Sequence, residues 1–83
     1  MDKVLIKLYV PIIEEKYDMW IPINKKIHEI IKLIVKAIKE NTGEVYETKD
    51  FPMIYDKITG KNYNVNLRVI ETNIRNGSEI ILI

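Results

Sequence analysis

One amphipathic stretch, residues 24–43, constrains the fold of this chain more than any other part of its sequence. Asn24 stands where a helix N-cap belongs, and Gly43 stands where a helix end needs a positive φ angle. Between them isoleucines recur at the spacing of one helical face, and lysines fall mainly on the other side. The members of the apolar face are Ile27, Ile30, Ile31, Ile34 and Ile38. Isoleucine is an indifferent helix former, so the pattern predicts a helix that is stabilised by burial.

The two stretches before the helix alternate with period two, as half-buried β-strands do. In residues 3–10 one face carries Val4, Ile6, Leu8 and Val10. Pro11 ends this strand because it removes a backbone donor. In residues 16–23 one face carries Tyr17, Met19, Ile21 and Ile23. The two strands predict a hairpin whose connection is longer than a tight turn, which leaves its register open.

The second half of the chain reads as short strands separated by turns. A polar connection over residues 44–50 leads to a short strand that begins after Pro52, and Gly60 marks the next turn. Residues 62–64 can add a very short edge strand. The stretch 67–74 is irregular, with one possible helical turn, and supplies core residues Leu67, Val69, Ile70 and Ile74. An Asn-Gly turn then precedes a last strand over 78–83.

This order of elements predicts an α+β domain with the β-grasp arrangement. A mixed four- to five-stranded sheet would cover the isoleucine face of one long helix, with the first and last strands parallel at its centre. The alternative is another small α+β sandwich in which the same elements are connected differently. With 83 residues, the chain is expected to form one domain over 1–83, near the lower size limit for a single core.

Several motifs of the second half are shared with a known superfamily. They are Met53-Ile54-Tyr55, Gly60-Lys61, Leu67 with Val69, residues 73–78, and the closing run Ile80–Ile83. On these the chain resembles the ubiquitin-like superfamily over essentially its whole length. It looks most like the bacterial YukD/EsaB-like group associated with type VII secretion, through VLIKLYVP, KYDMWIPIN followed by KKIHEIIKLI, and NIRNGSEIILI.

The chemically active branches of that superfamily are not matched here. Ubiquitin and the sulfur carriers act through a Gly-Gly tail, whereas this sequence has no glycine after Gly77, so we expect no conjugation. There is no cysteine to hold the cluster of a β-grasp ferredoxin. His28 is the only histidine, and the only serine, Ser78, is expected to cap its turn. The acidic pairs, Glu14 with Glu15 and Glu44 with Glu47, fall in loops. We therefore expect no catalytic residue, no cofactor and no metal site.

The outer face of the sheet carries the sharper functional signal. Period two sends several apolar side chains, including Tyr9, away from the helix, where a solvated sheet face should be polar. Such a patch is typical of an interaction site. The candidate protein-interaction residues are Leu5, Trp20, Ile54, Ile81 and Ile83. The resemblance adds that partners of ubiquitin grip the corresponding surface, including the position that matches Ile54.

The sequence thus favours a non-enzymatic, non-conjugated interaction module. The resemblance implies a cytoplasmic accessory of a type VII secretion system that docks on a membrane or ATPase component, and no signal peptide or membrane-spanning run is apparent. One alternative is a basic helix face that binds nucleic acid or anionic membrane. Its lysines are Lys25, Lys26, Lys32, Lys36 and Lys39. The net charge of +1 and the lack of interleaved aromatic residues disfavour nucleic acid. A homodimer formed through the sheet face is the other alternative.

Overall fold

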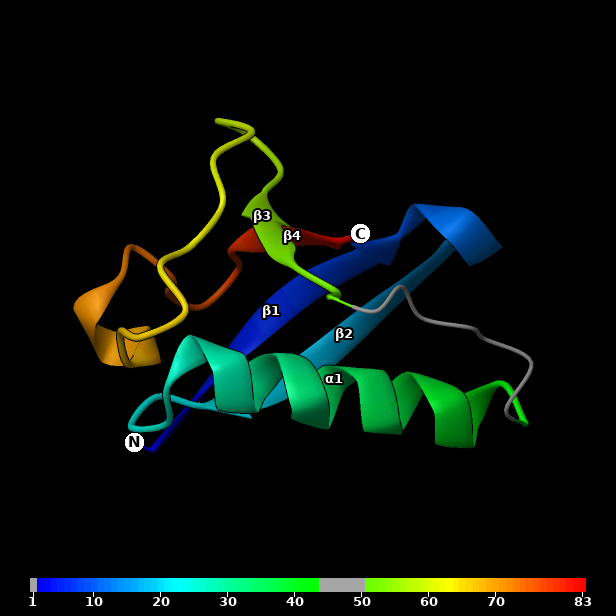
Figure 1. The fold of residues 1–83 in the computed structure, drawn as a ribbon, viewed down its shortest axis with the longest axis horizontal. Helices are drawn as coiled ribbons and strands as arrows, with labels where there is room; N and C mark the ends of the chain where they lie inside the picture. The colour runs from blue at the N-terminus through cyan, green and yellow to red at the C-terminus, as the bar shows by residue number, and fades with distance from the viewer. Residues whose placement is uncertain (1, 44–50) are drawn as a thin grey trace.

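The computed structural model describes residues 2–43 and 51–83 (Figure 1). Within them the strands are β1 (Lys3–Val10), β2 (Glu15–Pro22), β3 (Ile54–Asp56) and β4 (Glu79–Leu82), and the helix is α1 (Ile27–Asn41). Two short 3₁₀ turns, η1 (Pro11–Ile13) and η2 (Val69–Glu71), lie in the connections. The polar connection over 44–50, with Glu44 and Glu47, lies outside the described residues.

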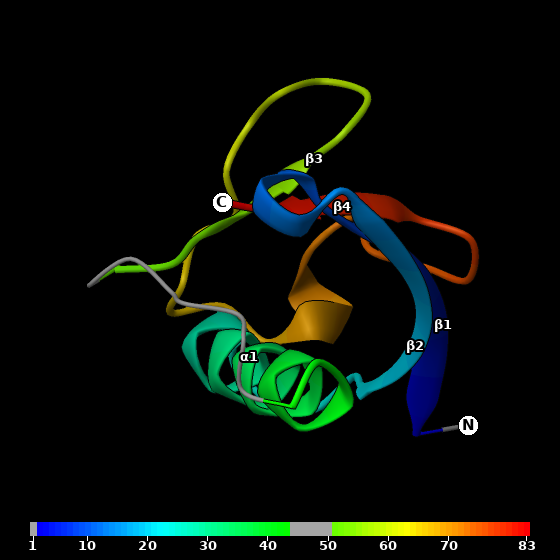
Figure 2. The same cartoon turned by 90° about the vertical axis from the view of Figure 1, so that its right-hand side faces the viewer.

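The strands form one mixed sheet in the order β2-β1-β4-β3. β1 and β4 pair in parallel at the centre, and both outer pairings are antiparallel. The helix lies across one face of this sheet (Figures 1 and 2). This arrangement confirms the predicted β-grasp fold. The very short edge strand expected at 62–64 is present only as a single bridge between Tyr55 and Asn62.

The hairpin register that the sequence left open is continuous. Every residue from Lys3 to Val10 has a partner in β2, ending with Val10 opposite Glu15. Pro11 opens η1, and Glu14 closes the connection with a φ of 52°, its N–H donating to the carbonyl oxygen of Pro11 at 3.0 Å. A short turn with one left-handed residue thus takes the place of a tight two-residue turn.

The helix begins two residues later than predicted, because its first N–H groups have other acceptors. Lys26 takes the N-cap position without a side-chain cap, and Asn24 lies outside the helix. The N–H of Ile27 donates to the carbonyl of Leu67 at 2.8 Å, and the N–H of His28 to the carbonyl of Val65 at 3.1 Å. A distant loop therefore does what the Asn24 side chain was expected to do. At the other end, Gly43 has the predicted positive φ, at 66°.

The core lies between the helix and the sheet. All five isoleucines of the predicted face are buried, against the inward side chains of the strands. The irregular stretch after Asn66 contributes Val69 and Ile74, which are fully buried. Leu67 is only half-buried, and the prediction for Ile70 is wrong, since this side chain is 41 % exposed. Ile70 follows Val69 directly in the tight turn η2, so the two side chains cannot both point into the core.

The Asn-Gly turn before β4 is fastened to β1. The N–H of Leu5 donates to Oδ1 of Asn76 at 2.8 Å, and the N–H of Gly77 donates to the carbonyl of Leu5 at 2.8 Å. Gly77 has a φ of 87°. The Ser78 hydroxyl accepts a hydrogen bond from the N–H of Arg75 at 2.8 Å, as expected for a turn cap. These contacts help to fix the register in which β4 pairs with β1.

Candidate protein-interaction surface

The outer face of the sheet is the face that α1 does not cover. Strand alternation and the observed pairing place on it the odd-numbered side chains of β1 and β4, the even-numbered ones of β2, and Tyr55 of β3. Four of the five predicted interaction residues lie there or beside it: Leu5, Trp20, Ile81 and Ile83. Trp20 is 52 % exposed and Ile83 47 %, whereas Leu5 and Ile81 are half-buried.

The predicted outward position of Ile54 is wrong. Ile54 is fully buried, because it lies directly opposite Leu82 in the antiparallel pair of β3 and β4. Directly opposed residues share a face of the sheet. Leu82 points toward the helix, so Ile54 does too, and the next residue, Tyr55, takes the outward place opposite Ile81.

The outer face consists of rows of side chains that run across the strands. In the first row Trp20 lies opposite Leu5. In the second, Lys7 lies between Asp18 and Glu79, and the row ends at Lys57, whose Nζ is 4.0 Å from Oε1 of Glu79. In the third row Tyr9 lies between Lys16 and Ile81, and Ile81 is opposite Tyr55.

The second row divides the apolar surface into two groups. Trp20 and Leu5 form one group, and Tyr9, Ile81 and Tyr55 form the other, with Ile83 beyond them at the end of β4. The predicted residues therefore do not meet in one continuous patch. The sequence interpretation missed the charged row, and it did not include Tyr55. Alternation could have shown which side chains point outward, but not which of them lie next to one another.

A shallow recess of about 410 Å³ lies on this face around Tyr9. The Nζ atoms of Lys16 and Lys57 are 5.9 and 5.7 Å from the centre of the Tyr9 ring, within the range of cation–π attraction. Asp18 and Glu79 also line the recess. The site therefore offers charges of both signs around one aromatic ring, which suits a polar partner surface rather than an apolar ligand.

Among the described residues, three titratable groups have altered pKa values, and all three lie at turns or in the core. The backbone N–H of Ile58, at 2.9 Å, is the main cause of the lowered pKa of Asp56, and Asp56 shapes the turn after β3. The backbone N–H of Arg68 likewise lowers the pKa of Glu71 in η2. Burial, and then the charge of Asp56, raises the pKa of Tyr63 to about 12. None of these three groups lies in the rows described above.

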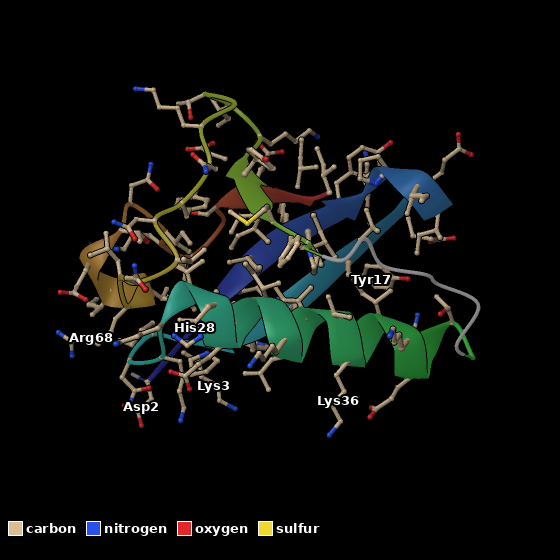
Figure 3. The ribbon with its side chains drawn as sticks, in the orientation of Figure 1. Asp2, Lys3, Tyr17, His28, Lys36 and Arg68 are labelled. Carbon is tan, nitrogen blue, oxygen red and sulfur yellow. The ribbon has the colours of Figure 1, made fainter. Side chains whose placement is uncertain are left out.

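Within the described part of the chain, the only histidine of the sequence does not belong to a metal site. His28 lies exposed in the first turn of α1 (Figure 3). Across residues 2–43 and 51–83, His, Asp and Glu side chains form no group of three that could hold a metal ion. In the same part of the chain, no helix is long and apolar enough to cross a membrane.

The lysines of α1, with Lys25 and Lys26 just before it, form the alternative surface. All are exposed, and Lys36 points away from the sheet (Figure 3). Lys25, which precedes α1, forms an ion pair with Glu29 of the helix at 3.9 Å, so one of these positive charges is already paired. Leu33, 48 % exposed, lies among them. The face is thus basic but not uniformly so.

The fold is shared with ubiquitin-like domains of known structure. The ubiquitin-like domain of EccD5 from Mycobacterium xenopi matches 99 % of this chain and 93 % of its own, with a TM-score of 0.80 and 12 % identity. The ubiquitin-like domain of the type VII secretion protein ECCD1 from Mycobacterium tuberculosis matches 100 % and 99 %, with a TM-score of 0.79 and 10 % identity.

A chain of an ESX-5 inner membrane complex is similar to this protein over 99 % of its residues, with a TM-score of 0.81 and 10 % identity. The match covers only 21 % of that longer chain. No protein-family model and no curated protein matches the sequence. At these identities the likeness establishes the ubiquitin-like β-grasp fold and nothing finer.

Proposed function

Because the chain has the ubiquitin-like fold, we propose that it is a non-enzymatic, non-conjugated protein-interaction module acting as a single domain over residues 1–83. Its role would be that of a cytoplasmic accessory in a bacterial type VII secretion system, of the YukD/EsaB-like kind. It would dock through the outer sheet face on a membrane or ATPase component of that system. The proposed contact residues are Leu5, Trp20, Tyr55, Ile81 and Ile83.

The observation that carries this proposal is the exposure of Trp20 beside Leu5 on a sheet face. Tryptophan is among the residues that most often dominate binding energy, and here 52 % of its surface is open. The charged row of Lys7 and Glu79 adds specificity, because a partner must place complementary charges between two apolar contacts. A partner that fits only the Trp20 group would cover this charged row without offering it opposite charges.

The secretion assignment is supported by the sequence resemblance and by the compared structures. Two of those structures are ubiquitin-like domains of EccD proteins, and the third is a chain of an ESX-5 inner membrane complex. Of these, ECCD1 is described as a type VII secretion system protein, and its ubiquitin-like domain has this fold. The same fold in this protein would suit contact with such an apparatus from its cytoplasmic side.

A binding titration tests the proposal. The purified protein is titrated calorimetrically with purified cytosolic regions of the type VII membrane and ATPase components from the same organism. We expect one of them to bind, and Trp20→Ala to weaken binding at least ~30-fold, the size of an interface hot spot. Lys36→Ala, on the opposite side of the molecule, is the control and should bind as the wild type does.

Each other outcome is informative. If no component binds, the secretion assignment is wrong while the fold stands. If a component binds Trp20→Ala as tightly as the wild type, the outer face is the wrong surface. Lys32→Glu with Lys36→Glu then tests the basic face of α1. Binding by that face would weaken steeply as salt is raised, as phosphate-driven binding does.

A further inference from the structure

β2 is an edge strand, and this has a consequence that is independent of the proposed function. In the order β2-β1-β4-β3 only one side of β2 is paired. Among residues 2–43 and 51–83, no other strand or bridge lies along its free side. The free edge of β2, an eight-residue strand, presents unpaired N–H and C=O groups to which another strand can add.

The hydrogen bonds show which residues offer these groups. The N–H of Ile23 donates to the carbonyl of Asp2 at 2.9 Å, so the peptide groups of residue 23 point toward β1. Peptide direction alternates along a strand, so residues 21, 19, 17 and 15 also point toward β1. Lys16, Asp18 and Trp20 therefore point their N–H and C=O groups away from the sheet.

The charges along this edge are self-complementary in one register. Lys16 and Asp18 are both exposed, and both side chains lie on the outer face. In an antiparallel pair of two β2 strands, Lys16 can face residue 16, 18 or 20 of the other copy. The first choice opposes two lysines, and the last opposes Asp18 to Asp18. Only the second places a lysine opposite an aspartate, and symmetry makes that pair twice.

We propose that two copies of this chain pair through their β2 strands into a symmetric dimer with one continuous sheet. Lys16 of each copy lies opposite Asp18 of the other, and the two Tyr17 residues meet at the two-fold axis. The axis is perpendicular to the sheet, so both helices lie on one side and both outer faces on the other. The dimer therefore leaves both apolar groups of the outer face, the Trp20 group and the group around Tyr9, open to a partner.

Charge reversal tests the pairing. The wild type should show a concentration-dependent rise from the 9.8 kDa of one chain toward twice that mass by light scattering. Lys16→Asp alone and Asp18→Lys alone should stay at the single-chain mass, because each opposes like charges. Mixed in equal amounts, they should regain the double mass, since every cross-strand pair is then opposite in charge. Lys3→Asp, the same charge change on β1, is the control and should dimerise.

A disulfide tests the register, and the chain has no native cysteine to interfere. Non-hydrogen-bonded partners have Cα atoms about 4.5 Å apart, within disulfide range. Tyr17→Cys should therefore form a covalent dimer in air. Met19→Cys should not, because the two residues 19 would lie ~13 Å apart. Thermal melting confirms that each variant is folded.

Three results would overturn the proposal. The first is a wild type that stays at the mass of one chain at roughly 1 mM, the weak end of measurable affinity. The second is a mixture of the two charge variants that remains monomeric. The third is cross-linking through residue 19 rather than 17, which would mean another register. If this edge binds an extended peptide of another protein and not a second copy, the wild type will stay at the mass of one chain.

Discussion

The side-chain oxygen of Asn76 accepts a hydrogen bond from the backbone N–H of Leu5 at 2.8 Å, from 71 positions away in the sequence. Asn76 precedes β4 in the sequence, and its amide oxygen accepts the Leu5 N–H where a carbonyl of a longer β4 would otherwise do so. Together with the bond from Gly77 to Leu5, it extends the parallel pairing of β1 and β4 by a side-chain contact.

Replacing Asn76 by alanine should therefore destabilise the fold. The change leaves the Leu5 N–H without its protein acceptor at the start of the central strand pair, and we expect a loss of about 1 kcal/mol in the free energy of unfolding. Asn24→Ala is the matched control, since Asn24 does not cap α1, and it should change stability by less than about 0.5 kcal/mol. Urea unfolding of both variants measures the difference; equal losses would contradict it.

Ile54 and Tyr55 should respond in opposite ways to truncation. Ile54→Ala removes a fully buried side chain from the core and should cost about 2–5 kcal/mol of unfolding free energy. Tyr55→Ala alters the outer face and should cost less stability while weakening binding to the partner. Chemical unfolding and calorimetric titration, run on both variants, separate the two effects. A stable Ile54→Ala variant that fails to bind would restore the original outward placement.

Val69 and Ile70 make a second contrasting pair within η2. Val69 is fully buried, and Val69→Ala should lower the unfolding free energy by about 2 kcal/mol. Ile70 is 41 % exposed, and Ile70→Thr should be nearly neutral. Thermal melting followed by circular dichroism gives both values. A larger drop for Ile70→Thr than for Val69→Ala would mean that Ile70 belongs to the core.

Glu71 should make stability depend on acid pH. Its pKa is lowered in the folded protein, mainly by the backbone N–H of Arg68. A carboxyl with a lowered folded pKa contributes stability above its ordinary pKa of 4.5, and this contribution is lost as the pH falls through the folded pKa. Glu71→Gln should flatten that loss in urea midpoints measured between pH 6 and about 2. Wild type and variant should converge at the acid end; parallel curves would exclude this role.

The parts of the fold that depend on local periodicity could be predicted from the sequence. The buried isoleucines of α1 and the inward residues of β1 follow from the repeat of a helix and of a strand, which neighbouring residues set by themselves. The positive φ of Gly43 is similarly local. The predictions of these features were correct because they depend on neighbouring residues and not on distant parts of the chain.

The errors arose where a distant segment decides the outcome. Asn24 does not cap the helix because the carbonyls of Val65 and Leu67 accept the first N–H groups of α1 instead. Ile54 points inward because of its pairing with Leu82. The candidate site depended on the same kind of information, since the charged row that includes Lys7 appears only once the register of three strands is known.

The pairing of β1 with β4 also governs when this protein can fold during synthesis. A ribosome makes Lys3–Val10 early, yet one side of that central strand has no partner until Glu79–Leu82 has emerged. Until then the hairpin and helix can associate, but the sheet has an open seam through its middle. The sheet can close only after Glu79–Leu82 has been made, so β1 stays unpaired on one side while all the residues between the two strands are synthesised.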